Sequence, residues 1–347
     1  MSRTDRFIKA CRMEATDCTP VWFMRQAGRY MSQYRKIRQK YSLMEMFKTP
    51  EIAAEITLQP VEAFSVDAAI IFADILLPLE GMGFKLEFID YEGPVIGNPI
   101  RNLSDLHRVR VADPEEHLGY VLKALELVSS ELNGKVPLIG FAGAPFTLAC
   151  YAIEGGSSPD HLLTKQLMYR EPVLWERLMD KFCQTITAFL TAQVRAGARV
   201  VQIFDSWIGI LSPSDYRQYV FQYHQKIFCA LKASEIISIH FGTGTAGLLS
   251  QLAQAGGDVI GVDWRISLAE AWNRVGSNFG IQGNLDPVAL TAPRSIYESK
   301  AAEILEEVAG RPGHIFNLGH GILPSTPEDS VGALADFVHE YSAKLRR

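Results

Sequence analysis

Short apolar runs recur along the chain, and most are followed by a stretch whose apolar residues repeat at helical spacing. Runs that are apolar on both faces are typical of buried parallel strands. Eight of them occur, at residues 21–25, 68–74, 138–143, 199–206, 236–242, 259–264, 279–285 and 314–319. Strands that alternate with helices predict an α/β fold, a closed (β/α)8 TIM barrel.

Helix positions follow from the same pattern. Residues 171–194 carry Leu174, Leu178, Phe182, Ile186 and Leu190 at helical spacing. The run 212–215, Ser-Pro-Ser-Asp, predicts a helix start with a serine cap and a first-turn proline. Residues 85–99 interrupt the alternation, with Phe88, Tyr91, Pro94 and Gly97, and predict a hairpin or loop over one end of the barrel. We find no repeats or linkers, so we expect a single catalytic domain over residues 1–347.

Composition narrows the class of protein. The 347 residues are 48% hydrophobic and 21% charged, which suits a large buried core. The net charge of −5 lacks the basic footprint of a nucleic-acid binder, so no nucleic-acid partner is expected.

Cysteine usage and the N-terminal sequence bear on location. The five scattered cysteines contain no C-x-x-C pair, which predicts neither a zinc clamp nor a disulfide framework. The N-terminus resembles neither a signal nor a transit peptide, and no apolar run approaches the roughly 20 residues that span a bilayer. We therefore expect a cytoplasmic protein without a membrane partner.

In barrels of this kind the active site lies at the C-terminal ends of the strands, where the loops converge. Applied to the eight predicted strands, this rule yields one short list of candidates. They are Arg25, Asp74, the loop from Gly143 to Tyr151, Asp205 with Ser206, His240, Asp263 with Trp264, residues 284–286, and His320.

The segment Arg25-Gln26-Ala27-Gly28-Arg29 carries two arginines four residues apart. On a helical turn they would share one face and could bind separate carboxylates through charge-assisted hydrogen bonds. The alternative is that both arginines lie on a solvated helix face. The position of Arg25 directly after an apolar run argues against this alternative.

Asp74 ends an otherwise apolar strand. One hypothesis is that its carboxylate accepts hydrogen bonds from several N–H donors and stabilises positive charge. The alternative is that it caps the next segment. Asp67 precedes the same strand, at the opposite end, and is predicted to be structural.

Three further candidates each have a structural alternative. Tyr151 follows a loop of small residues and is either a site residue or a core tyrosine. Ser206 is either a donor to a substrate carboxylate or a cap. His320 stands between two glycines, which would let its ring reach the barrel mouth, although a structural histidine fits as well.

Two further signals are weak. His240 has no second histidine or cysteine at ligand spacing, so no metal site is predicted. Residues 242–247 have the G-x-G-x-x-G form of a dinucleotide-binding turn, yet they follow the fifth strand instead of opening a domain. A small-residue turn into a barrel helix would give the same spacing.

Several of these segments together resemble the uroporphyrinogen decarboxylase family. The blocks that carry the resemblance are 25–29, 71–74, 140–151 with 154–156, 261–264, 282–287 and 317–321, and it extends from about Pro20 to the C-terminus. The chain departs from the family pattern at Ala73, where many relatives have a serine beside the aspartate. This difference puts one hydrogen bond in doubt but does not change the role expected of Asp74.

The resemblance implies a (β/α)8-barrel carboxy-lyase, usually a homodimer, that decarboxylates uroporphyrinogen without a metal or other cofactor. By matching motif, Arg25 and Arg29 would bind substrate carboxylates, with Gln26, Ala27 and Gly28 between them also at the substrate. Asp74 would meet the pyrrole N–H groups, and Tyr151, Ser206 and His320 would line the cleft. Protonation of a pyrrole would provide the electron sink, so the substrate replaces a cofactor. Arg25, Tyr151 and His320 are rival proton donors.

Two other classes stay open. The same barrel superfamily includes corrinoid-linked methyltransferases with a zinc-bound His-x-Cys and a later cysteine, whereas this chain has His240-Phe241-Gly242 and no cysteine on the eighth strand. A non-catalytic porphyrin-binding protein is the second, and CO₂ release would eliminate it.

Overall fold

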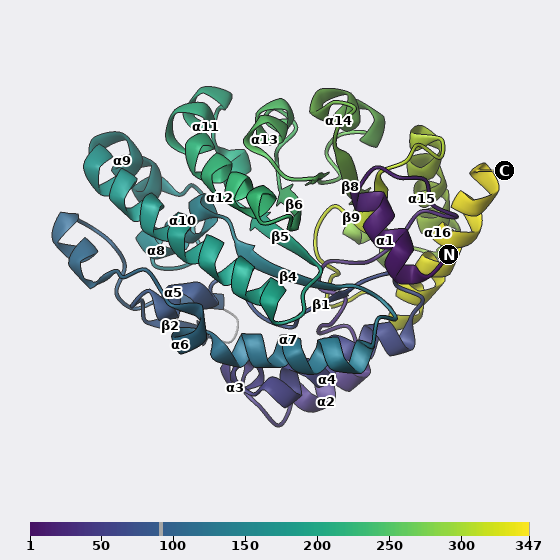
Figure 1. The fold of residues 1–347 in the computed structure, drawn as a ribbon, viewed down its shortest axis with the longest axis horizontal. Helices are drawn as coiled ribbons and strands as arrows, with labels where there is room; N and C mark the ends of the chain where they lie inside the picture. Colours follow the sequence, from purple (N-terminus) through teal and green to yellow (C-terminus); the bar gives the residue numbers. More distant parts are fainter. Residues whose placement is uncertain (90–92, 347) are drawn as a thin grey trace.

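The computed structural model describes residues 1–89 and 93–346 and shows a parallel sheet surrounded by helices (Figure 1). The sheet has seven strands in the order β1-β4-β5-β6-β7-β8-β9, and each neighbouring pair is parallel. These strands are β1 (Ala69–Ile70), β4 (Leu138–Gly143), β5 (Val200–Asp205), β6 (Ile237–Gly242), β7 (Val259–Gly261), β8 (Gly280–Leu285) and β9 (His314–Leu318). The mixed α/β architecture is therefore as expected.

Helices precede the sheet, connect its strands and end the chain. They are α1 (Arg3–Cys11), α2 (Ser32–Arg38), α3 (Leu43–Lys48), α4 (Pro50–Ala63), α5 (Leu77–Gly81), α6 (Pro114–His117), α7 (Gly119–Leu132), α8 (Pro145–Glu154), α9 (Leu162–Arg170), α10 (Pro172–Arg195), α11 (Pro213–Tyr219), α12 (Phe221–Ala233), α13 (Leu249–Ala255), α14 (Leu268–Val275), α15 (Arg294–Val308) and α16 (Glu328–Leu345), with 3₁₀ turns η1 (Leu103–Arg108), η2 (Ile208–Ile210) and η3 (Pro287–Thr291). No helix in the described ranges has both the length and the apolar character needed to cross a membrane.

The two helices predicted in detail are confirmed. Helix α10 buries Leu174, Leu178, Phe182, Ile186 and Leu190 along one face, because these residues recur at helical spacing. Helix α11 begins after a serine whose side chain accepts the backbone N–H three residues later, as the predicted cap requires.

The segment predicted as the first strand contributes a single bridge residue instead. Val21 forms an isolated parallel bridge with Phe316 of β9, and Trp22 N–H donates to the Phe316 carbonyl over 3.3 Å. Phe23 N–H then donates to the side chain of Gln26. The expectation of an eight-stranded sheet is not confirmed, because a side-chain acceptor here takes a backbone donor that a strand would have used.

The segment nevertheless lies between β9 and the start of β1. Asp67 N–H, two residues before β1, donates to the Val21 carbonyl over 2.7 Å. The Trp22 indole donates to Gln282 of β8 over 2.9 Å, and Gln282 donates to Gln202 of β5 over 3.0 Å. These buried polar side chains connect the segment to strands on both halves of the sheet.

Two strands, β1 and β7, end three or four residues before their predicted ends. Strand β1 ends four residues before Asp74, since Phe72 N–H donates to Thr57 of α4 over 2.9 Å and the chain leaves the sheet. Strand β7 ends two residues before Asp263. Both aspartates therefore lie on loops just beyond the strands.

The interruption between residues 85 and 99 is a hairpin, one of the two predicted forms. Strands β2 (Leu86–Ile89) and β3 (Gly93–Ile96) pair antiparallel. Ile96 N–H donates to the Gly155 carbonyl over 2.8 Å, which places the hairpin at the C-terminal end of α8. Tyr91 lies outside the described residues.

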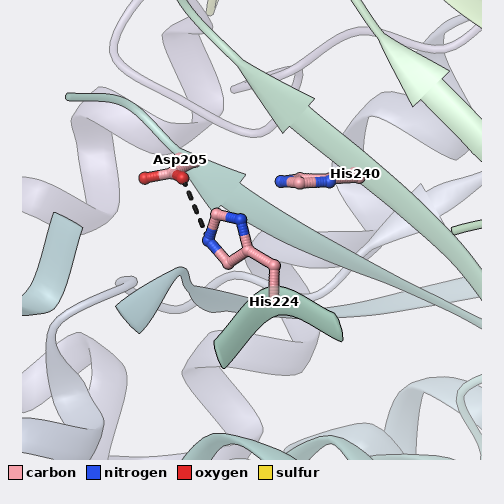
Figure 2. A group of neighbouring side chains, drawn as sticks. All are labelled: Asp205, His224 and His240. Carbon is pink, nitrogen blue, oxygen red and sulfur yellow. Dashed lines mark ion pairs between the residues drawn. The ribbon is translucent and has the colours of Figure 1, made fainter. Parts of the chain in front are cut away.

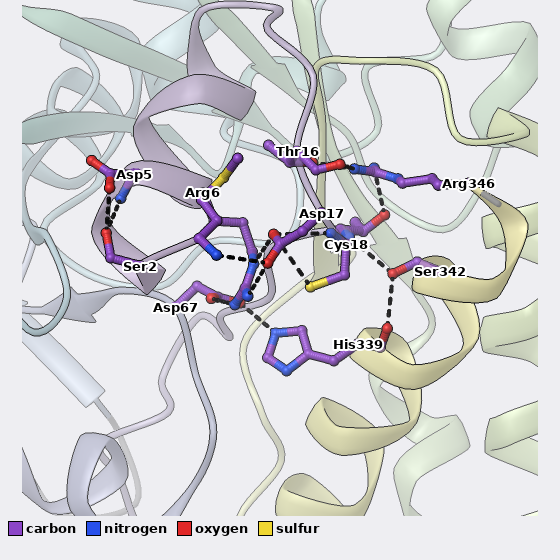
Figure 3. Close-up of polar contacts among 12 residues, drawn as sticks. Ser2, Asp5, Arg6, Thr16, Asp17, Cys18, Asp67, His339, Ser342 and Arg346 are labelled. Atoms are coloured by element: carbon purple, nitrogen blue, oxygen red, sulfur yellow. Dashed lines mark hydrogen bonds and ion pairs between the residues drawn. The ribbon is translucent and has the colours of Figure 1, made fainter.

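Asp67 joins the N-terminal segment, the start of β1 and α16 in a buried polar cluster (Figure 3). Its carboxylate accepts hydrogen bonds from Arg6 Nη1 over 2.7 Å and from Val21 N–H over 2.8 Å, and it lies 2.6 Å from His339 Nε2. Asp17 binds the same guanidinium at Nε and Nη2. These contacts support the predicted structural role of Asp67.

Candidate active site

Arg25 lies on the turn after the Val21 bridge, with its backbone in the left-handed region at φ 61°. A non-glycine residue has a local strain cost in this conformation, and such residues cluster at functional sites. Its side chain runs along Gly321, where an added Cβ would lie 2.5 Å from Arg25 Cδ. Glycine at position 321 therefore leaves room for Arg25 beside the His320 loop.

Residues 25–29 form bends and turns, so the helical turn predicted for them is wrong. Side-chain hydrogen bonds such as Phe23 N–H to Gln26 replace the helical ones. Arg29 is exposed, and its charge acts on Tyr34 of α2. Burial raises the pKa of the Tyr34 phenol, whereas the charges of Arg38 and Arg29 lower it. The two arginines thus do not share a helix face.

Gln26 is buried and both polar atoms of its amide bind the backbone. Its Oε1 accepts from Phe23 N–H over 3.0 Å, and its Nε2 donates to the Ala68 carbonyl over 2.9 Å. Ala27 and Gly28 are half-buried, and an added Cβ on Gly28 would lie 3.0 Å from the Arg25 carbonyl. The Gln26 side chain therefore holds the turn in place, and small residues let it close.

Asp74 lies on the loop between β1 and α5. Its Oδ1 accepts the Leu76 N–H over 2.9 Å, so the capping alternative accounts for one oxygen, while its Oδ2 accepts no hydrogen bond within the described residues. Burial raises the pKa of Asp74, whereas the bond from Leu76 and the charge of Arg25 lower it. Because the residue keeps partial exposure, one oxygen remains available to a ligand.

Tyr151 lies on α8 with its ring centroid 6.1 Å from that of Trp207. Burial raises the pKa of Tyr151, the charge of Asp74 raises it further, and Arg25 lowers it. The Trp207 ring also contacts His161, at 4.8 Å between centroids. Trp207 was not among the predicted candidates, although it directly follows Ser206 and the strand-end rule extended by one residue would have included it.

His320 is half-buried on the loop after β9. Its pKa is lowered to about 4, mainly by burial and in addition by the charges of Arg25 and Arg265, while the charge of Asp263 raises it. Its imidazole is therefore neutral at physiological pH.

Arg25 is the charge that these candidates share. Its guanidinium acts on the pKa values of Asp74, Tyr151 and His320, which lie on three separate segments of the chain. The structure thus brings four of the predicted residues together. Ser206 is half-buried next to Trp207, and its hydroxyl makes no hydrogen bond within the described residues.

The glycine motif at 242–247 serves packing. Gly244 N–H donates to Asp263 Oδ2 over 2.6 Å, where a nucleotide phosphate would need this donor. An added Cβ on Gly209 would lie 2.3 Å from the Thr243 carbonyl, so the two turns touch backbone to backbone. These contacts argue against a dinucleotide site.

A thiolate zinc site of the methyltransferase kind is also disfavoured. Within residues 1–89 and 93–346, the one group of three potential ligand side chains with ligand atoms within 4.8 Å is Asp205, His224 and His240, and it contains no cysteine. Gly242 stands where the His-x-Cys pattern would have its thiol.

Comparison with known proteins identifies the family. Residues 2–341 match the family model described as Uroporphyrinogen decarboxylase (URO-D). The chain belongs to the uroporphyrinogen decarboxylase family. The uroporphyrinogen decarboxylase of Roseiflexus sp. (strain RS-1) is 57% identical over 344 residues, 98% of this chain and 99% of the relative. That of Sorangium cellulosum (strain So ce56) is 57% identical over 335 residues, 96% of each. As a member of this family the protein is a carboxy-lyase.

Solved structures show the same fold in proteins of other activity. A methyltransferase from Methanosarcina mazei matches with a TM-score of 0.84 at 21% identity, covering 98% of this chain and 99% of the other. A B12-independent methionine synthase from Shewanella sp. W3-18-1 matches with a TM-score of 0.57 at 11% identity, covering 86% and 89%. At these identities the likeness shows the fold alone, and the decarboxylase family rests on the sequence relatives.

Proposed function

We propose that the protein removes CO₂ from the four acetate side chains of uroporphyrinogen III without a cofactor. The product is coproporphyrinogen III, an intermediate of heme and chlorophyll biosynthesis. The observation that carries the proposal is the convergence of Asp74, Tyr151 and His320 on the charge of Arg25. Relatives 57% identical over nearly the whole chain, named as uroporphyrinogen decarboxylases, support the same reaction.

The substrate supplies its own electron sink. A proton added to a pyrrole ring carbon makes the ring cationic, and the bond between the acetate methylene and its carboxylate then breaks. CO₂ leaves, and the electron pair of that bond moves into the ring and neutralises it. A second proton adds to the exocyclic carbon to make a methyl group, and the first leaves the ring, so each cycle consumes one proton.

Asp74 suits the task of stabilising this cation. Its Oδ1 is held by Leu76 N–H, which leaves Oδ2 for the pyrrole N–H groups. A carboxylate that is already fixed and partly desolvated needs little reorganisation when positive charge develops. Arg25 would bind and orient the reacting acetate by charge-assisted hydrogen bonds.

The three candidate proton donors differ in protonation. The pKa of His320, about 4, leaves its imidazole neutral, which favours a hydrogen-bonding role. Tyr151 keeps its proton at neutral pH, since burial raises its pKa. We therefore assign proton delivery to Tyr151 or Arg25 instead of His320.

The remaining predicted residues would bind the substrate periphery. Arg29 is exposed and would bind a carboxylate away from the reacting acetate. The Ser206 hydroxyl, beside Trp207, makes no hydrogen bond in the described part of the chain and would donate one to the substrate. Ala27 and Gly28 would allow close approach of the substrate to the turn, with Gln26 acting through the turn that it holds.

The proposal includes one (β/α)8-barrel domain over residues 1–347, with the segment around Val21 in place of the first strand. The Val21 bridge to β9 and the bond from Asp67 N–H support this closure. It also includes a cytoplasmic homodimer without nucleic-acid or membrane partners. The exposed Leu162, Tyr169 and Val173 around α9 offer apolar surface for a second subunit.

The test is anaerobic incubation with uroporphyrinogen III, followed by oxidation and chromatography of the porphyrins by carboxylate number. We expect the seven-, six- and five-carboxylate intermediates and then the four-carboxylate product. Binding without CO₂ release would instead support a porphyrin-binding protein, and transfer of a methyl group from a methylcorrinoid would support the methyltransferase class.

A further inference from the structure

A cation outside the predicted set lies beside the candidate active site. Arg265 is on the loop that follows β7, at the end of the sheet where the candidate residues gather. Its side chain is 53% exposed, yet its Nη1 donates to the buried Asp263 over 2.6 Å. Its guanidinium also lies over the Trp264 ring, 4.2 Å from the ring centroid. Arg265 is therefore a solvent-facing cation whose side chain is held in place by two neighbours.

Hydrogen bonds that do not involve the Arg265 side chain hold its loop. The buried side-chain amide of Asn284, on β8, donates to the carbonyls of Asp263 and Ile266 over 2.9 and 2.8 Å. Asp263 Oδ2 accepts the Gly244 N–H over 2.6 Å, and its Oδ1 accepts the Arg265 N–H over 3.0 Å. The loop should therefore keep its conformation when the Arg265 side chain is replaced.

The glycine turn at 242–247 rests on the buried end of β5. Thr243 N–H donates to the Asp205 carbonyl over 3.4 Å. The Asp205 carboxylate accepts a hydrogen bond from Thr147 over 2.7 Å and lies 3.2 Å from His224 Nε2 (Figure 2). Because the last three residues are buried, the turn that anchors the loop after β7 is itself fixed.

The loop after β7 packs against the segment that carries His320. An added Cβ on Gly319 would lie 2.5 Å from Trp264 N, so the two backbones touch. The pKa of His320 is lowered mainly by burial, and the charge of Arg265 contributes to the lowering more than Asp263 opposes it. Arg265 and Asp263 together therefore present net positive charge to His320.

Arg265 acts away from the proposed reacting centre. Burial raises the pKa of Asp74 and of Tyr151, and the cation that opposes this is Arg25. Arg265 Nε and Nη2 make no hydrogen bond within residues 1–89 and 93–346, so they can donate to a ligand. The substrate would carry eight carboxylates, of which one reacts at a time, and a chain of net charge −5 must hold the others through local cations.

We propose that Arg265 is a specificity-determining residue that binds a tetrapyrrole carboxylate other than the reacting one. This inference rests on the proposed function. The planar guanidinium can donate two parallel hydrogen bonds from Nε and Nη2 to that carboxylate while Nη1 stays on Asp263. Because the contact is the same before and during CO₂ loss, it should lower KM and leave kcat unchanged. The alternative is that Arg265 serves only as the ion partner of Asp263.

Arg265→Gln and Arg265→Lys test this contact by anaerobic kinetics and binding. Loss of a charge-assisted hydrogen bond should raise KM for uroporphyrinogen III about 10-fold in Arg265→Gln, with kcat within about 2-fold of the wild type. Arg265→Lys keeps the charge without the planar fork, so its KM should lie between the two. Binding of coproporphyrinogen III, followed by tryptophan fluorescence, separates the two sources of carboxylate. When KM rises, equally weakened binding identifies a propionate, and unchanged binding identifies an acetate.

Two further measurements separate a binding role from a structural one. Arg195→Gln removes an exposed arginine that is paired with Glu115, at the end of α10 that leads into the start of β5, and it should leave KM unchanged. The pKa of His320, about 4, should rise in Arg265→Gln, because a charge that lowers it is gone. NMR of the His320 imidazole measures this pKa without any turnover.

A higher His320 pKa with an unchanged KM would overturn the proposal, because Arg265 would then lie beside the site without binding substrate. A fall in kcat at unchanged KM would overturn it as well. In both cases a wild type that still decarboxylates leaves the proposed function intact. A wild type that neither binds coproporphyrinogen III nor releases CO₂ would overturn the proposed function together with this inference.

Discussion

Replacement of Asp74 by asparagine separates the charge of this side chain from its shape. The asparagine amide keeps an oxygen for the Leu76 N–H, which Asp74 Oδ1 accepts over 2.9 Å, so the loop before α5 should be preserved. The lost term is the attraction to the cationic pyrrole. Two unit charges about 4 Å apart interact by about 4 kcal/mol at an effective dielectric of about 20. Since about 1.4 kcal/mol is a tenfold change in rate, turnover should fall about 10³-fold.

The same change should not destabilise the protein. Burial raises the pKa of Asp74 in the folded state above its value in the unfolded state. The contribution of Asp74 to the free energy of unfolding is therefore fully present below the unfolded pKa, and it is lost as pH rises through the folded pKa. At neutral pH the ionised Asp74 therefore disfavours folding. Asp74→Asn should raise Tm at neutral pH, and the gain should vanish below the unfolded pKa of about 3.9.

The assay combines anaerobic steady-state kinetics with Tm measured across pH. In the wild type, kcat/KM should fall in acid with a midpoint above that of an ordinary aspartate, because Asp74 must be ionised. A variant that decarboxylates at the normal rate would refute the electrostatic role. A slow variant with a lower Tm at neutral pH would show that the loss is structural.

Three further predictions address binding, scaffold and cofactors. Arg29→Lys should weaken substrate binding and alter the distribution of partial products, and Arg25→Lys should also reduce the maximal rate. Steady-state kinetics with chromatography of the products measures both effects. Unchanged kinetics in both variants would show that the two arginines are solvated surface residues. Asp67→Asn should lower the free energy of unfolding in urea by about 3–5 kcal/mol by breaking a buried pair with Arg6. Asp17→Asn, which affects an exposed partner of the same arginine, should cost at most about 1 kcal/mol. Decarboxylation should persist after chelator dialysis without added nucleotide; recovery only with a dinucleotide would favour the glycine motif.

Regular elements with a clear apolar period were predictable from sequence. Strand β4 has the predicted bounds, and α10 begins one residue later and ends one residue later than expected. The segment after Pro20 was not predictable in the same way. Its apolar run reads as a strand, but Gln26 takes one of its backbone donors and Arg25 turns out of the extended region. Such side-chain acceptors leave no period in the sequence.

The strand-end rule accounts for much of the candidate site. Arg25, Asp74, Tyr151 and His320 were placed at one mouth from their positions after apolar runs, and the structure sets them around one charge. The helical pairing of Arg25 with Arg29 was wrong, because the turn is held by Gln26 instead of helical hydrogen bonds. The four-residue spacing of the two arginines could not by itself distinguish a helical turn from a turn held by a side chain.

The sequence by itself determined the alternation of strands and helices, and with it the end of the sheet at which polar residues gather, because burial on both faces and helical period are local properties of the chain. Only the tertiary structure decided which side chains meet across elements. His224 lies on a helix whose rotation against β5 and β6 is set by packing, so its approach to Asp205 and His240 has no counterpart in sequence spacing.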